Sequence, residues 1–238
     1  MTSPPDDPEP GPAPGKPQAG PQTLFRAILH IGTPRTAAAQ LQDFLMRQRH
    51  YLQDEGMAFC SGLHGAEDFK ALFHAAVSPS RRALMHDKVS RLGGLLLTGR
   101  VQRRIDAFRR RHRHMAAIFS AEMLSLLRQR DEMMRLKRLF PPGTEFTIVM
   151  CLREPADFLE AWGRELDGRR IPRGKEPGLS TYVEANSWLA DYDALISAYS
   201  LISSDIRVID YGNDADGGRA IGPAFCRALG MNTGEATA

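Results

Sequence analysis

The chain has 238 residues, of which 42% are hydrophobic, and its 31 Lys and Arg against 28 Asp and Glu leave a net charge of +3. That length and apolar content can bury one sizeable core, so we expect a single folded domain with tails. No apolar run approaches the roughly 20 residues of a membrane span, and the N-terminus lacks the basic-then-apolar order of a signal peptide. These features exclude a membrane protein and indicate a cytoplasmic one.

The three cysteines, Cys60, Cys151 and Cys226, lie far apart in the sequence. They show neither CxxC spacing nor an accompanying histidine pattern. We interpret them as reduced core thiols of a cytosolic protein, and we expect no metal site.

The ends of the chain differ in composition from its middle. Residues 1–22 hold eight of the 16 prolines and almost no large apolar side chain, which predicts a disordered or polyproline tail. Such a tail could carry a proline-rich partner-binding signal, although a merely solvated tail is the simpler interpretation. Residues 231–238 are small and polar and are expected to form a flexible tail. The folded domain is therefore predicted over 23–230.

Between the tails, apolar runs alternate with amphipathic stretches. Strands are predicted at 26–31, 57–60, 116–120, 146–152 and 206–210. Helices are predicted at 35–54, 121–139, 155–167, 181–202 and 218–229, with an irregular helical region at 66–114. This alternation is typical of a parallel sheet covered by helices on both faces, so we predict a three-layer α/β fold. Ligands of such sheets bind at the carboxyl ends of strands, where Gly32 and Arg153 both fall.

The most informative stretch is 27–42, where an apolar run ends at Gly32 and a loop with one cation, Arg35, leads into an amphipathic helix. This strand–loop–helix layout can cradle an anion between backbone N–H groups and the helix dipole. A purely structural interpretation stays open, with Thr33 as N-cap, Pro34 at the first helical position and alanines as helix formers. The final Gly-Lys-Ser/Thr of the Walker pattern is absent, so a magnesium–nucleotide loop is not expected.

A second motif lies where the strand at 146–152 ends. The strand delivers Arg153 into a loop just before the helix at 155–167. A planar guanidinium can bind a phosphate through two parallel hydrogen bonds, which makes Arg153 a second candidate anion ligand. Alternatively, Arg153 pairs with Glu154 or Asp157 at the surface.

These two stretches resemble the signatures of the sulfotransferase family. The family's opening motif reads roughly Leu-His-Ile-Gly-x-Pro-Lys-Thr-Gly-Thr-Thr-x-Leu-Gln. The chain keeps its strand, glycine, proline, cation and Leu-Gln, while residues 37–39 are alanines. The second signature is Arg-x-Pro-x-Asp followed by a serine–aromatic pair, where Arg153 and Trp162 match and Ala161 replaces the serine. In the family, that arginine and serine hold the 3′-phosphate of the donor, 3′-phosphoadenosine-5′-phosphosulfate (PAPS).

Two weaker likenesses extend the resemblance over 24–212. Residues 118–124 are similar to the Ser-Ser-Glu-x-Leu at a strand end of many bacterial members. Residues 186–211 are similar to the family's long helix and closing strand. The resemblance therefore implies a P-loop-like, sulfotransferase-like fold.

The resemblance also implies an activity, the transfer of a sulfuryl group from PAPS to a hydroxyl or amine of a glycan or small-molecule acceptor. It assigns donor binding to Gly32, Thr33, Pro34, Arg35, Thr36, Ala37, Ala38, Ala39 and Arg153. Arg35 would neutralise the bridging oxygen, and Glu122 would remove the acceptor proton. Glu122 could instead merely complement the dipole of the helix predicted at 121–139.

The alanines of the loop count against this activity. Each hydroxyl bond lost to a charged phosphate is worth about 1.5–3 kcal/mol, so two threonines and one serine sum to roughly 4–9 kcal/mol. An alanine in the left-handed conformation of the family glycine costs about 1–2 kcal/mol more. The backbone donors of 35–39 and the helix dipole remain. The alternative is therefore a catalytically inactive protein of the same fold that binds an anionic ligand or a partner.

The segment 81–114 is strongly basic, with 11 Arg and Lys against Asp87 and Asp106. Its densest part, 100–114, is interpreted as a solvated helix face or as a surface that steers an anionic donor or glycan. The sequence disfavours nucleic acid, because no aromatic stacking platform accompanies the cations. No pattern in the chain indicates an oligomeric state.

Overall fold

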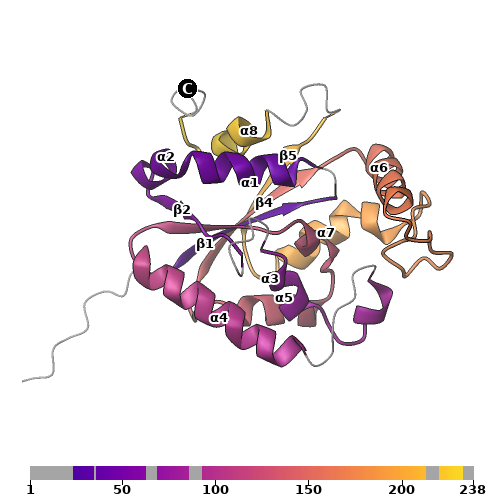
Figure 1. The fold of residues 1–238 in the computed structure, drawn as a ribbon, viewed down its shortest axis with the longest axis horizontal. Helices are drawn as coiled ribbons and strands as arrows, with labels where there is room; N and C mark the ends of the chain where they lie inside the picture. Colours follow the sequence, from indigo (N-terminus) through magenta and orange to yellow (C-terminus); the bar gives the residue numbers. More distant parts are fainter. Residues whose placement is uncertain (1–23, 35, 63–68, 86–92, 213–219, 233–238) are drawn as a thin grey trace, which may run out of the picture.

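The computed structural model describes residues 24–34, 36–62, 69–85, 93–212 and 220–232. Over these residues, the centre of the fold is a parallel sheet of five strands in the order β2-β3-β1-β4-β5 (Figure 1). The strands are β1 (Arg26–Gly32), β2 (Met57–Phe59), β3 (Ala116–Ser120), β4 (Glu145–Leu152) and β5 (Asp205–Asp210). Each neighbouring pair runs parallel, as the continuous apolar runs predict.

Helices cover both faces of the sheet. The described α-helices are α1 (Ala38–Arg47), α2 (Arg49–Asp54), α3 (Ala71–Ala76), α4 (Gly93–Arg111), α5 (Arg130–Arg138), α6 (Pro155–Gly168), α7 (Tyr192–Tyr199) and α8 (Ile221–Ala228). Figure 1 places α1, α2 and α8 on one face and α3, α4, α5 and α7 on the other, while α6 follows the carboxyl end of β4. The three-layer α/β fold expected from the sequence is thus confirmed.

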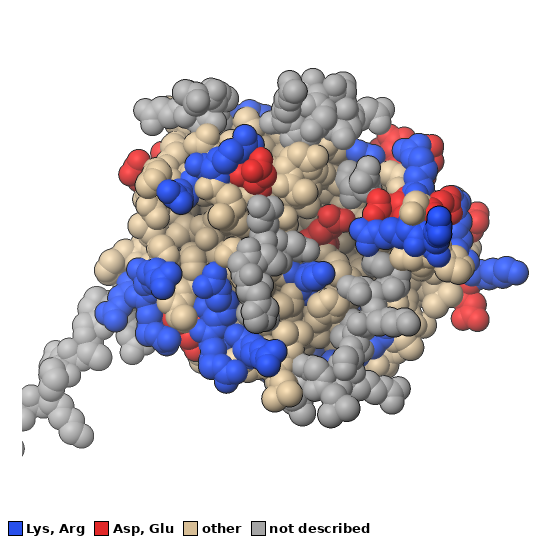
Figure 2. All heavy atoms as spheres, viewed as in Figure 1, with Lys and Arg blue, Asp and Glu red and all other residues tan. Residues whose placement is uncertain are grey.

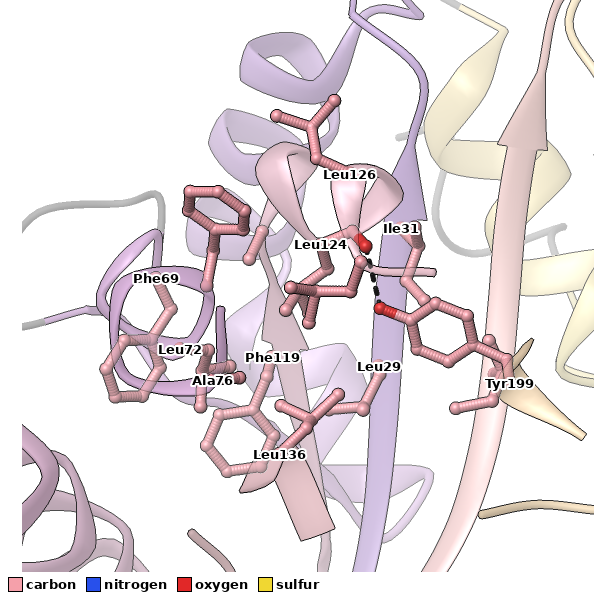
Figure 3. Close-up of a cluster of buried hydrophobic side chains, with 14 of the residues drawn as sticks. Leu29, Ile31, Phe69, Leu72, Ala76, Phe119, Leu124, Leu126, Leu136 and Tyr199 are labelled. Atoms are coloured by element: carbon pink, nitrogen blue, oxygen red, sulfur yellow. Dashed lines mark hydrogen bonds between the residues drawn. The ribbon is translucent and has the colours of Figure 1, made fainter. Parts of the chain in front are cut away.

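The alternation of side chains along the strands divides the core in two. From β1, Leu29 and Ile31 pack in the core beneath α3, α4 and α5, whereas Ile28 joins the core beneath α1 and α8 (Figure 3). From β4, Met150 lies in the first core and Cys151 in the second. Because both faces are buried, these strands carry uninterrupted apolar runs, and their ends are held rigidly at the edges of the sheet.

The cysteines Cys60, Cys151 and Cys226 are free and buried, as expected. Burial raises the pKa of Cys60 and of Cys151 to about 12, so both thiols stay protonated at neutral pH. Within the described residues, no group of His, Cys, Asp and Glu is placed to hold a metal ion. None of the described helices combines the length and apolar character needed to cross a bilayer.

The helix predicted at 35–54 starts later than expected and is divided. It begins at Ala38, and Gln48 separates it into α1 and α2. The late start follows from Ala37, whose backbone is left-handed (φ 57°, ψ 32°) and cannot belong to a right-handed helix.

The helix predicted at 121–139 is wrong in its first half. Residues Glu122–Leu126 form a short 3₁₀ helix, η3, and α5 begins only after a break. The break lies at residues 127–129, and it is stabilised by Glu132 in the first turn of α5, whose side chain is fully buried. Its carboxylate accepts hydrogen bonds from the backbone N–H groups of Ser78 (3.1 Å), Arg128 (2.9 Å) and Gln129 (3.1 Å). These bonds cap α5 and prevent a continuous helix.

The helix predicted at 181–202 is wrong in its first half as well. A 3₁₀ turn, η4 (Trp188–Ala190), precedes α7, and Asp191 caps α7 by accepting the N–H of Ala194 at 3.0 Å. The irregular region predicted at 66–114 contains α3, the 3₁₀ turn η2 (Arg82–Leu84) and α4. The tail predicted at 1–22, residues 233–238 of the tail predicted at 231–238, and the predicted start of the last helix at 218 lie outside the described residues. At Met231 the predicted tail is wrong, because this side chain is buried and its N–H donates to the carbonyl of Cys226 at 3.0 Å.

Candidate anion-binding site

A pocket of 530 Å³ opens at the carboxyl edge of the sheet, where β1, β3 and β4 end. It is lined by Pro34, Ala37, Ala38, Ala39, Gln40, Glu122, Arg153, Ala161, Trp162, Arg164, Glu165 and Arg169. The pocket thus brings together Glu122 and, of the residues predicted for the donor, Pro34, Ala37, Ala38, Ala39 and Arg153. Gly32, Thr33 and Thr36 were also predicted for the donor, but they are not among the residues that line the pocket. Arg35 lies outside the described residues.

The loop after β1 is a tight turn that its own buried hydroxyl closes. Thr36 donates its hydroxyl to the carbonyl of Thr33 at 2.7 Å, and its backbone N–H donates to the same oxygen at 3.2 Å. A Cβ at Gly32 would lie 2.5 Å from Thr36 Oγ1, so only glycine fits there. The N–H of Thr33 donates to the carbonyl of Cys151 at 3.2 Å, which fixes the loop against the end of β4. The Thr36 hydroxyl is therefore used to shape the loop.

Ala37 ends this loop in a strained conformation. Its φ of 57° lies in the left-handed region, which costs a residue with a Cβ about 1–2 kcal/mol. The first hydrogen bond of α1 runs from the N–H of Leu41 to the carbonyl of Ala37 at 2.9 Å. The N–H groups of residues 38–40 therefore have no acceptor inside α1, and they lie at the positive end of its dipole. Backbone donors at this end of α1 are what an anion requires.

Arg153 reaches the pocket from the end of β4. Its backbone carbonyl accepts the hydroxyl of Tyr192 at 2.7 Å, and its Cζ lies 5.3 Å from the centre of the Tyr211 ring. The buried Nε of Arg153 has no hydrogen-bond partner among the described residues. Burial raises the pKa of Tyr192 to about 12, so its hydroxyl remains a donor that holds the Arg153 loop.

The alternative pairing of Arg153 with neighbouring carboxylates does not occur among the described residues. Glu154 instead accepts the backbone N–H groups of Ala156 at 2.8 Å and Asp157 at 3.0 Å. It therefore acts as the N-cap of α6, with Pro155 in the first turn. The guanidinium of Arg153 is left without an ion-pair partner in the described part of the chain.

Glu122 lines the pocket from the first residue of η3. The α-helix predicted at 121–139 is absent there, but Glu122 does lie in the first turn of a helix, the 3₁₀ helix η3, so its alternative role beside a helix dipole stays open. The turn is held firmly, since Tyr199 donates its hydroxyl to the carbonyl of Leu124 at 2.8 Å (Figure 3). Ser125 donates its hydroxyl to the carbonyl of Glu122 at 2.8 Å. The backbone that carries the Glu122 carboxylate is thus anchored to the core.

Two arginines complete the pocket, one within α6 and one directly after it, and the sequence motifs did not indicate them. Arg164 and Arg169 line it together with Ala161, which replaces the family serine. Each guanidinium forms an ion pair one helical turn back, Arg164 with Glu160 at 2.5 Å and Arg169 with Glu165 at 2.5 Å. In the sequence these pairs look like ordinary surface pairs at i,i+4 spacing. Only the spacing of three residues from Ala161 to Arg164 could have placed that arginine on the pocket face.

A buried polar network lies close beneath the loop. His30 is fully buried, and its Nδ1 lies 2.9 Å from the hydroxyl oxygen of Ser120, which also accepts the side-chain amide of Gln42 at 2.9 Å. Burial lowers the pKa of His30 to about 3, so the ring is neutral. The network connects β1 and β3 to the first turns of α1 and belongs to the frame of the pocket.

No protein-family model and no curated protein sequence matches the chain. Among solved structures, it is similar to the sulfotransferase domain from the curacin biosynthetic pathway, with 12% identity and a TM-score of 0.47 over 88% of this chain and 75% of that chain. It is also similar to a sulfotransferase from Alicyclobacillus acidocaldarius, with 14% identity and a TM-score of 0.49 over 91% of this chain and 83% of that chain.

A third similar structure is the sulfotransferase domain of the Synechococcus PCC 7002 olefin synthase. Its identity is 14% and its TM-score 0.46, over 93% of this chain and 78% of that chain. All three structures are sulfotransferases or sulfotransferase domains.

Proposed function

We propose that the chain is a sulfotransferase that binds PAPS in this pocket and transfers its sulfuryl group to a hydroxyl or amine of a small-molecule or glycan acceptor. The observation that carries the proposal is the convergence of three distant segments on one pocket. Pro34 with residues 37–40, Glu122 and Arg153 are far apart in sequence, and each belongs to a different sequence motif.

The chemistry of the pocket fits an anion with two charged ends. The N–H groups at the start of α1 suit a 5′-phosphosulfate, and Arg153 suits a 3′-phosphate. Arg164 and Arg169 supply further guanidinium groups on the Arg153 side of the pocket. Arg164 would exchange an exposed partner, Glu160, for a phosphate, and an exposed pair of this kind is worth only about 0–1 kcal/mol. Arg169 would exchange the half-buried carboxylate of Glu165. These arginines can therefore compensate in part for the serine that Ala161 replaces.

In the proposed reaction, Arg35 neutralises the bridging oxygen while Glu122 receives the acceptor proton. The sulfur–oxygen bond to the donor breaks as a bond forms from sulfur to the acceptor oxygen or nitrogen, and adenosine 3′,5′-bisphosphate leaves. Such transfers depend mainly on positioning and charge neutralisation. Arg35 remains protonated at neutral pH, so it acts by charge and not as a proton donor.

A second candidate function is donor-like anion binding without transfer. It is favoured by the wall formed by Ala37, Ala38 and Ala39, which offers no side-chain hydroxyl to the pocket. Under this alternative the backbone cradle is retained while the groups that act on the transferred sulfuryl group are lost.

A transfer assay separates these functions. Labelled PAPS is incubated with the chain and a cell extract as acceptor source, and label is followed into products. The substitutions Ala37→Gly, Ala38→Thr and Ala39→Thr together should raise turnover, because they restore two hydroxyls and relieve the strained backbone. Glu122→Gln should lower turnover about 100-fold or more while leaving donor affinity unchanged. The absence of labelled product from both the wild type and the triple variant, with an intact fold, would overturn the transferase proposal.

A further inference from the structure

A second surface of the molecule is strongly basic and lies away from the pocket. In Figure 2, Lys and Arg side chains gather over α4, on the face of the sheet that α3 and α5 also cover. Two adjacent hollows, of 760 Å³ and 580 Å³, open beside α4. Both are lined by Arg109, Pro141 and Pro142, so the two hollows are neighbours, and we call them together the basic groove.

The basic groove combines an apolar floor with a cationic rim. Its floor contains Met134, Pro141 and Pro142, and the exposed side chain of Leu24 lies at one end. The rim carries Arg109, Arg110, Arg113, Lys137 and Arg138, all of which are exposed. A groove of this composition matches a ligand that offers both apolar and anionic groups.

The charges of this rim are poorly compensated by the protein itself. Asp106 is the single acid among the described lining residues, and its carboxylate lies 3.9 Å from Arg109. In the described part of the chain, Arg110, Arg113, Lys137 and Arg138 form no ion pair. The guanidinium of Arg113 donates instead to the carbonyl of Arg110 at 3.3 Å. The rim therefore presents a net positive field to an approaching partner.

The basic groove lies at the opposite edge of the sheet from the pocket. It includes Phe25, directly before β1, and the turn at 141–144, directly before β4. The N–H of Glu145 donates to the carbonyl of Phe25 at 2.9 Å, so the amino ends of β1 and β4 lie side by side at this edge. A ligand in the groove would thus bind at the amino ends of the strands, away from the carboxyl-edge pocket. Its role is therefore separate from the proposed donor chemistry.

We propose that the basic groove docks an acidic segment of another protein, one that carries large apolar side chains next to Asp or Glu. The apolar floor favours a polypeptide over a glycan, which has no large apolar side chains to cover it. A second copy of this chain would place the same cations opposite one another in a symmetric contact, which opposes self-association through this surface. Charge complementarity therefore selects an acidic protein partner.

Nucleic acid fits the basic groove less well. Single strands bind through stacking on exposed aromatic rings together with cations. Among the described residues, the large exposed hydrophobic side chains are not aromatic. They are Leu24, Met46, Leu96, Leu201 and Val208. Apart from the exposed imidazole of His114, the described lining of the groove thus offers cations to a polyanion without an exposed aromatic ring for stacking.

The test is a selection from a phage-displayed library of random 16-residue peptides against the full chain. Selected peptides are then synthesised, and their affinities are measured by fluorescence anisotropy at two salt concentrations. The groove variant is Arg109→Glu with Arg138→Glu. The matched control, Arg47→Glu with Arg49→Glu, makes the same charge change on exposed residues of α1 and α2, across the sheet. Circular dichroism checks that both variants are folded.

We expect selected peptides to be rich in Asp, Glu and large apolar residues. The affinity of the peptides for the groove variant should be about tenfold or more lower than for the wild type, whereas their affinity for the control variant should change little. Raised salt, or replacement of the apolar residues of the peptides by serine, should lower their affinity for the wild type to a similar extent. The proposal is overturned if no peptide is enriched, or if both variants bind the peptides equally. It is also overturned if heparin or a 20-nucleotide oligothymidylate binds the groove more tightly than the peptides do.

Discussion

Single residues decide how well the pocket can hold an anion. The hydroxyl of Thr36 closes the loop through its hydrogen bond to the carbonyl of Thr33. The backbone of Ala37 is left-handed, a conformation that is strained for alanine and unstrained for glycine. Arg153 retains a buried Nε without a partner among the described residues. The pocket therefore combines a well-shaped backbone and a free guanidinium with a loop poor in side-chain donors.

The Ala37 backbone predicts a stabilising substitution. Ala37→Gly removes the left-handed penalty and should raise the free energy of unfolding by about 0.5–1.5 kcal/mol, the strain relieved less the extra chain entropy of glycine. Ala39→Gly is the matched control, because Ala39 lies inside the right-handed α1 and should lose about 0.5–1 kcal/mol. Urea unfolding followed by circular dichroism measures both. Equal destabilisation by the two glycines would show that the loop is not strained.

The candidate site was partly predictable at this scale. Arg153 and Glu122 follow apolar strands, so parallel topology alone puts them on one rim. Arg164 and Arg169 were missed because each pairs with a glutamate at helical spacing, a pattern that typifies solvated helix surfaces. Their place in the pocket depends on how α6 packs against the rest of the fold, and a local sequence pattern does not predict that packing.

At the scale of elements, the strands and the helices differ in how far sequence predicts them. The strands carry continuous apolar runs, which are typical of strands buried on both faces, and their predicted bounds agree closely with β1, β3 and β4. The helix predictions at 121–139 and 181–202 were wrong in their first halves, where 3₁₀ turns form instead. In the first of these segments, a contact with a residue distant in sequence helps to determine the backbone conformation. The carboxylate of Glu132 accepts the backbone N–H of Ser78, more than 50 residues earlier, and no local periodicity reveals this contact.

The network that joins β1, β3 and α1 predicts a pH dependence. His30 has a folded pKa of about 3, below its unfolded value near 6.5, so only the unfolded chain binds a proton between these values. Stability is therefore unaffected by His30 above about pH 6.5 and falls as the pH drops below it. The loss contributed by His30 between pH 6.5 and 5 should be about 2 kcal/mol.

The His30→Gln variant isolates this contribution. It keeps a polar group beside Ser120 but cannot titrate, so the difference in stability between wild type and variant should shrink as the pH falls. Denaturant unfolding at pH 5.0, 5.75, 6.5 and 7.5 measures this difference. Parallel stability curves for the two proteins would contradict a buried neutral histidine.

At the scale of the whole molecule, the sheet separates two charged surfaces. The pocket lies at the carboxyl edge, and the basic groove lies at the amino edge, beside α4. Three arginines of the sequence segment 81–114, Arg109, Arg110 and Arg113, line this groove, and none of them lines the pocket. A face that steers the donor, one of the alternatives for this segment, is less compatible with that placement than a docking surface.

The most direct test of the central claim is calorimetric binding of adenosine 3′,5′-bisphosphate to the wild type and to Arg153→Ala. Arg47→Ala is the control, because Arg47 is an exposed arginine that pairs with Asp43 on α1 outside the pocket. We predict weak binding by the wild type, equal binding by Arg47→Ala, and a loss of about tenfold to a hundredfold in Arg153→Ala, as expected for a charged hydrogen bond. Equal affinity in the wild type and Arg153→Ala, or no binding by the wild type, would contradict the assignment of the pocket as a donor site.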